Sequence, residues 1–363
     1  MNKQRIAVIG LGYVGLPLAV ALSKKFKVIG FDKKKQRIKK LKLGIDNNGE
    51  AKKKDLKNKN LIFVDNEKLL INLDLFIICV PTPIFNKKPD LKNLIEATKL
   101  VGKKLSQNKI VIYESTVFPG TTEEICAPIL EKTSSLKLNK SFFLGYSPER
   151  INPGLGSKKI SDIKKVISAS TLGTLKKIKK IYKPIIKAGI YEAKSIKVAE
   201  SAKIIENTQR DLNIALMNEF SQILNKMKIN TNDVLDAAKT KWNFNNYTPG
   251  LVGGHCIGVD PYYLAYKAKK VGINPKVILS GRSVNDEMHN YVFNKVKKFK
   301  NIKKIAYLGI TFKEDCKDFR NSMPIKLFKK LSKKKFKIDV FDPIVDWSEL
   351  KNFENIKIEK KMK

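Results

Sequence analysis

The sequence predicts an α/β fold in which two Rossmann-like, doubly wound domains are joined by a long central helix, with an incomplete carboxyl-terminal domain. In the amino-terminal half, short apolar runs alternate with stretches of helical periodicity. Residues 195–228 then carry an apolar residue every three or four positions without Gly or Pro, which predicts one long helix. A shorter strand–helix–strand pattern follows near the end of the chain.

The amino-terminal domain is expected to span residues 1–194. Its first strand is "RIAVIG" (5–10), a continuous apolar run typical of a strand buried on both faces, and "YVGLPLAVALSKK" continues with helical spacing. Further strand candidates lie at 27–32, 61–65, 74–80, 109–115, 142–150 and 164–170. Strands that alternate with helices in this way predict a parallel, doubly wound sheet with helices on both faces.

The rest of the chain divides into two further regions. Residues 195–295 form a predicted helical region whose first helix suits a domain connection or an oligomer interface, because it is too long for a crossover. Residues 296–363 form a second, smaller α/β domain with strand candidates at 303–310, 336–341 and 356–360. Three strands would leave an open sheet edge, so we expect this domain to be incomplete.

Length and composition exclude several classes of protein. With 363 residues and 42% hydrophobic residues, the chain is long enough for two or three domains with substantial cores. Its four cysteines are far apart and form no CxxC pair, which argues against a disulfide framework or a zinc site and suits a reducing cytosol. We expect no bound metal.

The amino terminus resembles a signal peptide, because "MNKQR" precedes an apolar run. However, Gly10, Gly12, Gly15 and Pro17 interrupt this run, and it continues into two lysines without a small-residue cleavage site. No other stretch of the sequence could cross a bilayer. We therefore expect a soluble, cytoplasmic protein with no membrane partner.

The formal net charge of +39 invites a nucleic-acid interpretation. Only six of the 73 basic residues are arginine, however, whereas proteins that recognise phosphates and bases favour its bidentate guanidinium. The lysines are also spread along the whole chain. We expect solvated lysine faces with weak, non-specific attraction to polyanions and no specific nucleic-acid partner.

The segment "GLGYVG" (10–15) is a GxGxxG motif that follows a predicted strand and opens a predicted helix. Gly10 permits the tight turn, Gly12 lets the backbone approach a pyrophosphate, and Gly15 allows close packing of helix and strand. Asp32 closes the second strand, where a carboxylate accepts from the ribose hydroxyls and repels a 2′-phosphate. The pattern predicts NAD rather than NADP as the cofactor. Further expected cofactor contacts in this motif are Tyr13 and Val14.

The stretch "PGLVGGHCIGVDPYYL" (249–264) contains Cys256 among glycines, a histidine and an aspartate. By itself it leaves three interpretations open: a small core residue, a metal ligand or a nucleophile. A nicotinamide cofactor favours the nucleophile, because a cysteine can trap an aldehyde as a thiohemiacetal that loses a hydride to give a thioester. Gly253, Gly254 and Gly258 would leave such a pocket open at the backbone.

Seven motifs together resemble the nucleotide-sugar 6-dehydrogenases, the UDP-glucose/GDP-mannose dehydrogenase family, in order and spacing over residues 1 to about 345. The motifs are "GLGYVG", "ESTVFPGTTEE", "YSPERINPG", "AESAKIIENTQRDLN", "KWNFNNYTPGLVGGHCIGVDPYYLA", "GRSVND" and "TFKEDCKDFRNS". The resemblance is closest to the branch that oxidises UDP-N-acetylglucosamine or UDP-N-acetylgalactosamine to the uronic acid. Members of the family usually continue for several dozen residues past "FDPIVD", which supports the expectation of an incomplete domain.

The resemblance implies catalytic roles for six residues. Cys256 is the implied nucleophile, and Lys203 is the implied group that polarises the developing oxyanion. Asn207 lies one helical turn after Lys203 on the same face. The remaining roles in positioning water, proton transfer and thioester hydrolysis fall to Asp260, Thr116 and Glu149. Some relatives carry a second carboxylate four residues after the last of these, where this chain has Pro153.

The resemblance also implies binding residues and a partner. Thr82 and Thr116 complete the expected cofactor site. The implied substrate is a UDP-N-acetylhexosamine, and the implied assembly is a homodimer formed through the helix at 195–228. The expected substrate contacts, some of them shared with the catalytic set, are Glu149, Arg150, Lys203, Asn207, Gly253, Arg282, Lys313 and Arg320.

The implied reaction is a four-electron oxidation of the sugar C6 hydroxyl for surface polysaccharide biosynthesis. One NAD⁺ takes a hydride from the alcohol, and Cys256 captures the resulting aldehyde. A second NAD⁺ oxidises the adduct to a thioester, and activated water releases the carboxylate.

Two alternative functions stand beside this one. An inactive nucleotide-sugar- or polyanion-binding remnant of the family is favoured by the expected truncation and the high charge, but not by the retained catalytic residues. A β-hydroxyacid dehydrogenase also joins a GxGxxG domain to a long helix with a key lysine, but it needs no cysteine loop.

The other candidate residues have structural interpretations. Cys79 lies inside an apolar run and Cys126 in a helical stretch, so both are expected in the core. Cys316 stands where the family usually has threonine and is interpreted as drift. His255 adjoins Cys256, but neighbouring side chains in an extended segment point apart, which argues against a Cys–His pair.

Overall fold

The computed structural model describes residues 4–151, 159–254, 257–299, 302, 304–314, 319, 321–334, 336–345 and 357–358. The chain divides into two compact units, Met1–Ile204 and Ile205–Lys363. The predicted three-part division at residues 194 and 295 stays a prediction. None of the described helices is long and apolar enough to cross a membrane.

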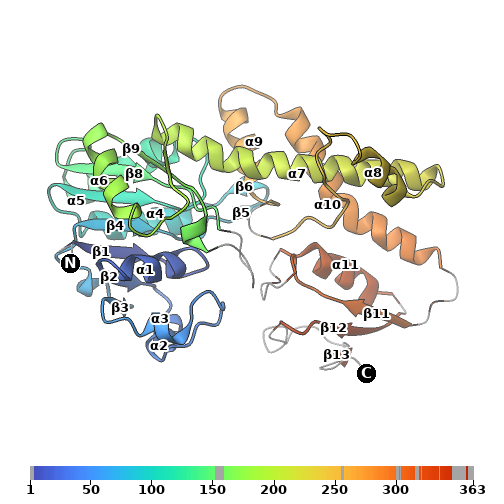
Figure 1. Ribbon diagram of the computed structural model, residues 1–363, viewed down its shortest axis with the longest axis horizontal. Coiled ribbons are helices and arrows are strands. Elements are labelled where there is room, and N and C mark those ends of the chain that lie inside the picture. Colours follow the sequence, from blue (N-terminus) through green and yellow to red (C-terminus); the bar gives the residue numbers. More distant parts are fainter. Residues whose placement is uncertain are drawn as a thin grey trace. The chain divides into compact units, whose positions relative to one another are not determined.

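The first unit is built on a sheet with the strand order β10-β9-β8-β7-β4-β1-β2-β3 (Figure 1). Neighbouring strands from β3 to β8 pair in parallel. The order β3-β2-β1-β4-β7-β8 is that of a Rossmann sheet, so the predicted fold of this unit is confirmed. The strands are β1 (Arg5–Ile9), β2 (Lys27–Phe31), β3 (Leu61–Val64), β4 (Leu75–Ile78), β7 (Lys109–Tyr113), β8 (Phe142–Tyr146), β9 (Lys165–Ala169) and β10 (Ile190–Glu192), with a separate hairpin of β5 (Ile84–Phe85) and β6 (Lys88–Pro89).

The sheet edge beyond β8 differs from the predicted parallel arrangement. β9 pairs antiparallel with β8, in a register that sets Gly145 opposite Ala169 and Tyr146 opposite Ser168. β10, which the sequence pattern did not predict, then pairs in parallel with β9. A parallel connection from β8 to β9 would need a crossover, usually a helix. The linking sequence, rich in Gly and Pro, disfavours such a helix.

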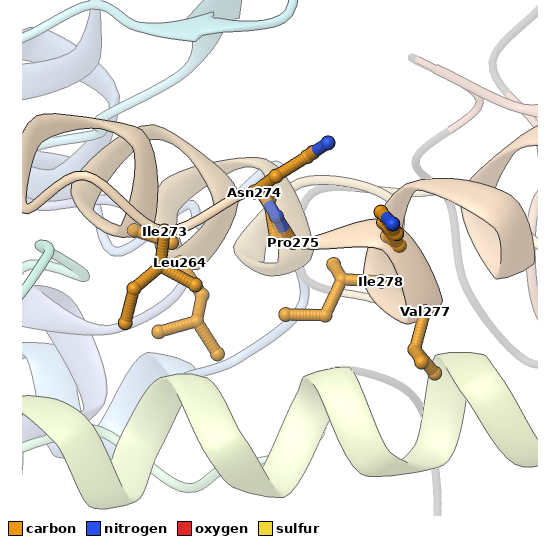
Figure 2. Close-up of a pocket in the computed structure, with 8 residues that line it drawn as sticks. Leu264, Ile273, Asn274, Pro275, Val277 and Ile278 are labelled. Atoms are coloured by element: carbon orange, nitrogen blue, oxygen red, sulfur yellow. The ribbon is translucent and has the colours of Figure 1, made fainter.

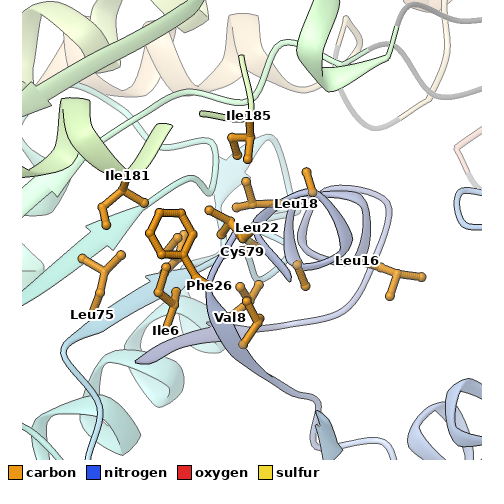
Figure 3. Packing of buried hydrophobic residues seen from close by; sticks show 14 of the residues in the cluster. Ile6, Val8, Leu16, Leu18, Leu22, Phe26, Leu75, Cys79, Ile181 and Ile185 are labelled. Carbon is orange, nitrogen blue, oxygen red and sulfur yellow. The ribbon is translucent and has the colours of Figure 1, made fainter. Parts of the chain in front are cut away.

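Helices cover both faces of this sheet. On β1, Ile6 and Val8 belong to one buried cluster with residues of α1 and α6, whereas Ala7 and Ile9 belong to another with residues of α4 and α5. Each such side chain, fully buried, contributes about 1.5–3 kcal/mol to stability when it is Val, Leu, Ile or Phe. Figure 3 shows part of the first cluster, including Phe26. The helices are α1 (Gly15–Ser23), α2 (Lys35–Lys42), α3 (Lys53–Leu56), α4 (Lys92–Gly102), α5 (Ala127–Ser134) and α6 (Leu172–Tyr182).

The long helix that the sequence predicts at 195–228 is α7 (Ile196–Lys226), drawn in green to yellow in Figure 1. Its sequence lacks Gly and Pro from end to end, so no residue interrupts its backbone hydrogen bonds. The part up to Ile204 belongs to the first unit and the rest to the second.

The second unit combines helices with a small sheet. β11 (Lys304–Leu308) and β12 (Lys337–Phe341) pair in parallel, and β13 (Lys357–Ile358) pairs in parallel with β12, as the three predicted strands require. A buried cluster joins Phe293, Phe328 and Val340 from α10, α11 and β12. The helices after α7 are α8 (Thr231–Ala238), α9 (Asp260–Lys270), α10 (Lys276–Lys297) and α11 (Met323–Ser332).

Candidate active site

The turn between β1 and α1 has the geometry that its glycines predict. Gly10 has a φ of +92°, and a Cβ atom there would lie 2.8 Å from the Cys79 carbonyl oxygen. A Cβ at Gly15 would lie 1.8 Å from the Gly10 carbonyl oxygen, so only glycine lets α1 start this close to β1. At Gly12 a Cβ would meet no atom within 4 Å. Side-chain-free backbone therefore faces open space at Gly12, where a pyrophosphate can approach.

This turn lies where a Rossmann sheet binds its ligand. β1 is flanked by β2 and β4, so the strand order reverses at β1, and ligands bind outside the carboxyl ends of the strands at such a point. The Val14 N-cap of α1 makes no side-chain capping hydrogen bond. The Leu16 N–H donates to the Gly12 carbonyl oxygen at 3.3 Å and Pro17 has no N–H, so the helix start offers an anion the Gly15 N–H and the positive end of the helix dipole.

Asp32 is fixed beside the same turn. Its Oδ2 accepts a hydrogen bond from the Leu11 N–H at 3.0 Å, and its Oδ1 accepts one from the Lys34 N–H at 2.9 Å. Each oxygen of a carboxylate has about two acceptor sites, so both retain one for a ribose hydroxyl. The neighbouring Lys33 ammonium pairs with Glu96 at 3.0 Å.

Arg37, which was not selected from the sequence, also holds this turn. Its Nε donates to the Leu11 carbonyl oxygen at 3.0 Å, and its Nη1 lies 2.7 Å from Asp46 Oδ1. The preference of arginine for bidentate contacts suits this bridging role. In the sequence, Arg37 could have been noticed only by its position after Asp32, and that spacing is not a known cofactor-binding motif.

Thr82 and Thr116, two predicted site residues from different strand ends, are joined directly. The Thr82 hydroxyl donates to the Thr116 carbonyl oxygen at 2.6 Å. Nearby, the Ser115 hydroxyl donates to the Val80 carbonyl oxygen at 2.7 Å. Because β4 and β7 are adjacent parallel strands, both threonines lie at their carboxyl ends.

Glu149 follows β8 and is buried. Its Oε1 accepts from the N–H groups of Arg150 at 2.7 Å and Ile151 at 2.6 Å, and Lys165 Nζ lies 3.2 Å from its Oε2. Burial by itself raises the pKa of this carboxyl, but the Lys165 ammonium and the two backbone donors outweigh burial and lower its pKa. Glu149 is therefore a carboxylate at neutral pH.

Glu200 in α7 is a second buried carboxyl, and the sequence did not single it out. Its two oxygens accept from the N–H groups of Gly120 at 2.6 Å and Thr122 at 2.9 Å. Burial raises the pKa of Glu200 to about 7. These bonds tie the first turns of α7 to the loop that follows Thr116 and to the π-helical turn η2 (Thr121–Cys126).

Lys203 lies one turn further along α7 and is buried. Within the described part of the chain, its ammonium makes no hydrogen bond or ion pair. A buried ammonium without a counter-ion is costly, so a group that develops negative charge beside it would gain from the contact.

In the second unit, Asn207 and Asp260 come together although 53 positions separate them. The Asn207 amide Nδ2 donates to Asp260 Oδ2 at 2.5 Å, and both side chains are buried. Asp260 is the first residue of α9 and precedes Pro261, which suits the first turn of a helix. The helix start thus fixes the carboxylate that the sequence selected.

The two positions just before the Cys256 segment, 253 and 254, require glycine because of close packing and not because of the open pocket that the sequence predicts. A Cβ at Gly253 would lie 2.7 Å from the Asn321 carbonyl oxygen, and one at Gly254 would lie 2.6 Å from the Phe312 ring. Gly254 has a φ of +85° and donates its N–H to the Asn321 carbonyl oxygen at 3.1 Å. Close packing therefore requires both glycines, and only Gly258 matches the expected openness, with no atom nearer than 3.8 Å.

Arg282, a predicted substrate contact, lies in a buried ion-pair network. Its Nη1 and Nη2 lie 2.5 Å from Asp211 Oδ1 and 2.5 Å from Asp286 Oδ1, and its guanidinium carbon lies 5.7 Å from the centre of the Tyr262 ring. The two carboxylates raise the pKa of Arg282 against the opposing effect of burial. Its contact with a substrate stays a prediction.

Arg150 donates from Nη1 to the Lys164 carbonyl oxygen at 3.1 Å, and Lys313 is half-buried. Cys79 and Cys126 are free and buried, as predicted, and burial raises the pKa of both thiols, that of Cys126 to about 12. The described residues include no group of His, Cys, Asp or Glu suited to a metal ion. Outside the described residues lie Pro153, His255, Cys256, Cys316 and Arg320.

A hollow of about 410 Å³ lies where α9 meets α10 (Figure 2). Its lining is apolar apart from two side chains and contains none of the predicted site residues. A nucleotide sugar needs charged and hydrogen-bonding partners, so this hollow does not fit the predicted substrate. The lining residues are Leu264, Ala268, Ile273, Asn274, Pro275, Lys276, Val277 and Ile278.

Comparison with known families covers most of the chain. Three models of the UDP-glucose/GDP-mannose dehydrogenase family match in order: the NAD binding domain at residues 4–186, the central domain at 197–287 and the UDP binding domain at 306–363. The first model contains the glycine turn and Asp32, which confirms the predicted cofactor, NAD.

Individual relatives agree with these models. The chain is 50% identical to a UDP-N-acetyl-D-glucosamine 6-dehydrogenase of Salmonella typhi, over 97% of this chain and 85% of that protein. It is 51% identical to a protein of the same name from Pseudomonas aeruginosa, over 95% and 84%. The solved structure of a UDP-D-ManNAc dehydrogenase from Pyrococcus horikoshii superimposes with a TM-score of 0.87 at 32% identity, over 94% and 84%. The predicted resemblance is thus confirmed, and the chain belongs to the UDP-glucose/GDP-mannose dehydrogenase family.

Proposed function

We propose that this protein oxidises the C6 hydroxyl of a UDP-N-acetylhexosamine to the uronic acid, in two NAD-dependent steps, for surface polysaccharide biosynthesis. The observation that carries the proposal is the identity of about half of all residues to two UDP-N-acetyl-D-glucosamine 6-dehydrogenases over nearly the whole chain. The open backbone at Gly12 and the fixed Asp32 carboxylate support the use of NAD. Bound NAD⁺ supplies the hydride acceptor, and the remaining chemistry belongs to side chains.

The proposed covalent steps use Cys256. Its thiolate adds to the C6 aldehyde and forms a carbon–sulfur bond, which gives a thiohemiacetal. Loss of the second hydride leaves a thioester, and attack of water on the thioester carbon breaks the carbon–sulfur bond and releases the acid. The overall reaction consumes two NAD⁺ and one water for each sugar.

Lys203 is the proposed stabiliser of negative charge on the sugar oxygen. Its ammonium is buried and without a partner in the described part of the chain, so it is available to an oxyanion and loses little solvation when it meets one. Such preorganised charge is worth about 2.7–4 kcal/mol per donor in related settings.

Asn207 and Asp260 form the proposed water-positioning pair. The Asn207 amide holds one oxygen of the Asp260 carboxylate at 2.5 Å, which fixes the acceptor that would meet a water or a substrate hydroxyl. Thr116 would assist at the carboxyl end of β7, and Glu149 would take part in thioester hydrolysis.

The proposed substrate contacts are distributed along the chain. The family model for UDP binding matches residues 306–363, which include Lys313 and Arg320. Arg150, Gly253 and Arg282 are further proposed contacts. A cytoplasmic location is part of the same proposal.

We also propose a homodimer formed through α7. Beyond residue 204 this helix exposes apolar side chains at spacings of three, four and eleven residues, which place them on one face. Exposed apolar stripes of this kind mark protein–protein interfaces more often than solvated surface. The stripe consists of Ile205, Leu216, Phe220 and Ile223.

The test incubates the full chain with NAD⁺ and UDP-N-acetylglucosamine or UDP-N-acetylgalactosamine and follows NADH and uronic acid together. Two NADH for each uronic acid are expected. The Cys256→Ser variant should form no uronic acid, whereas Cys126→Ala, a buried thiol elsewhere, should retain the reaction. Uronic acid at the wild-type rate from Cys256→Ser, or no NADH with either sugar, would overturn the proposal.

A further inference from the structure

Behind Glu149 lies a buried group of four titratable side chains, here called the Lys165 cluster: Glu114, Glu149, Lys165 and Tyr182. Lys165 Nζ lies 2.9 Å from Glu114 Oε2 and 3.2 Å from Glu149 Oε2. The Tyr182 hydroxyl donates to Glu114 Oε1. The side chains of the three charged residues are at most 8% exposed, so their interactions are only weakly screened by water.

The antiparallel strand β9 delivers the lysine. β8 and β9 pair with Tyr146 opposite Ser168, and the same register continued by three positions sets Glu149 opposite Lys165. Glu114 follows β7, the neighbour of β8 on its other side, and Tyr182 is the last residue of α6. Segments that are remote in sequence therefore meet at one point beside the carboxyl ends of β7 and β8.

The cluster contains two carboxylates and one ammonium. A buried carboxylate without a partner is strongly disfavoured, so the single positive charge decides which carboxyl stays ionised. Burial raises the pKa of Glu114 to about 7, whereas Lys165 and two backbone donors lower the pKa of Glu149. Near neutral pH Glu114 takes up the proton and Glu149 keeps the charge. A further titratable group that faces the cluster is Cys79, after β4.

Counting acceptor sites shows where Glu149 can act. A carboxylate has about four acceptor sites. The N–H groups of Arg150 and Ile151 occupy Oε1, and the Lys165 ammonium occupies one site on Oε2. One site on Oε2 is left, and its direction is set by the lysine.

We propose that Lys165 is the positioning residue for Glu149, holding its carboxylate ionised and turned so that the remaining site on Oε2 accepts a proton from the water that cleaves the Cys256 thioester. Glu114 and Tyr182 in turn hold Lys165. In this step the water oxygen bonds to the thioester carbon, the proton passes to Glu149, and the carbon–sulfur bond breaks to release the Cys256 thiolate. No oxidant is needed. The inference rests on the proposed function of Glu149 and adds the residues that tune it.

The sharpest test compares Glu114→Gln with the double variant Glu114→Gln/Lys165→Met. Glutamine can accept from Lys165 and donate to the Tyr182 oxygen, so the first variant keeps the cluster connected with one carboxylate and one ammonium. The double variant removes the Lys165 ammonium together with the second carboxyl group, so Glu149 is left as the one carboxyl group of the cluster and has no like group to oppose it.

The measured quantity is the acidic limb of the kcat–pH profile. Glu114→Gln should keep the wild-type limb, because Glu114 is already protonated where Glu149 titrates. The double variant should shift the limb to higher pH by about 1–3 units, the usual effect of losing one nearby opposite charge. The KM for the UDP sugar should stay unchanged. Below the shifted limb, the thioester should accumulate and appear as added mass on the intact protein.

Two controls separate the possible failures. The neighbouring Lys164 side chain is exposed, so Lys164→Met should leave the limb in place. Coincident limbs for Glu114→Gln and the double variant, with Glu149→Gln impaired, would overturn the inference about Lys165. Wild-type turnover by Glu149→Gln would instead contradict the proposed role of Glu149 itself.

Discussion

Asp260 is held at the first position of α9 by the Asn207 amide, and its charge is central to its proposed role in positioning the water. Replacement by asparagine keeps the size but removes the charge, so we expect kcat to fall about 10²–10⁴-fold with little change in KM. Steady-state NADH formation measures both constants. The exposed Asp233 in α8 provides the matched control, Asp233→Asn, which should retain wild-type kcat. An Asp260→Asn enzyme with normal kcat would exclude this role.

Replacing Arg282 should mainly lower the stability of the fold. Arg282→Met would leave the buried Asp211 carboxylate without its counter-ion, so we expect the free energy of unfolding to fall by about 3–5 kcal/mol. Arg210, exposed on α7, gives the control Arg210→Met, with a change of about 0.5 kcal/mol or less. Urea unfolding followed by circular dichroism tests the pair. Equal midpoints for both variants would show that the network contributes nothing.

The pH dependence of the free energy of unfolding should reveal the ionisation of Glu200. Its pKa is raised by burial from the ordinary 4.5 to about 7, so between these values the folded state retains a proton that the unfolded state has lost. Stability then falls as the pH rises through this window. The wild type should lose roughly 3 kcal/mol relative to Glu200→Gln from pH 4.5 to 7. Urea unfolding at a series of pH values should show the wild-type curve falling relative to that of Glu200→Gln, whereas the exposed Glu67→Gln should give a curve parallel to the wild type.

At the level of single residues, the sequence predicted those that stand in recognisable motifs. Asn207 and Asp260 were selected from two separate motifs, and the structure joins them. Lys165, Glu114 and Glu200 were not selected. Lys165 is one lysine among many, and its significance arises only from its contacts with Glu114 and Glu149 in other segments. Local sequence does not contain such contacts between distant segments.

Among the elements, the β1–α1 turn offers a paired test of two glycines. A Cβ at Gly15 would lie 1.8 Å from backbone, which cannot be relieved by a side-chain rotation, so Gly15→Ala should lower the thermal midpoint by several degrees or prevent folding. A Cβ at Gly12 has free space, so Gly12→Ala should fold normally but bind NAD weakly. Thermal unfolding and the KM for NAD⁺ separate the two. A stable Gly15→Ala protein would contradict this packing.

Helices and strands were predicted correctly where a hydrophobic pattern repeats over many residues, and less well at the edge of the large sheet. The 31 residues of α7 repeat one apolar pattern without a break, and its ends fall within two residues of those predicted. β9 was placed correctly but with the wrong direction, because an apolar run does not encode whether it pairs parallel or antiparallel. β10 has only three residues, none of them buried, and carries too little pattern to detect.

The whole molecule should be a dimer if the apolar stripe of α7 is an interface. Phe220→Asp places a charge in that stripe and should convert the dimer to a monomer, because an unpaired charge in an apolar interface is strongly disfavoured. Arg210→Glu, on another face of α7, should leave the dimer intact. Light scattering during size-exclusion chromatography gives the mass. A monomeric wild type would refute the interface.

Gly253 and Gly254 rest directly on the backbone around Asn321, inside the segment matched by the family's UDP binding domain. The two glycines that precede Cys256 and a segment matched by the UDP binding domain therefore pack directly against each other. If binding of a nucleotide orders one side of this contact, thermodynamic linkage requires a reciprocal effect. A covalent adduct on the other side would then change the nucleotide's binding free energy by the same amount as the nucleotide changes the free energy of the adduct. In this arrangement, we expect the affinity for the nucleotide and the stability of the proposed adduct at Cys256 to change together.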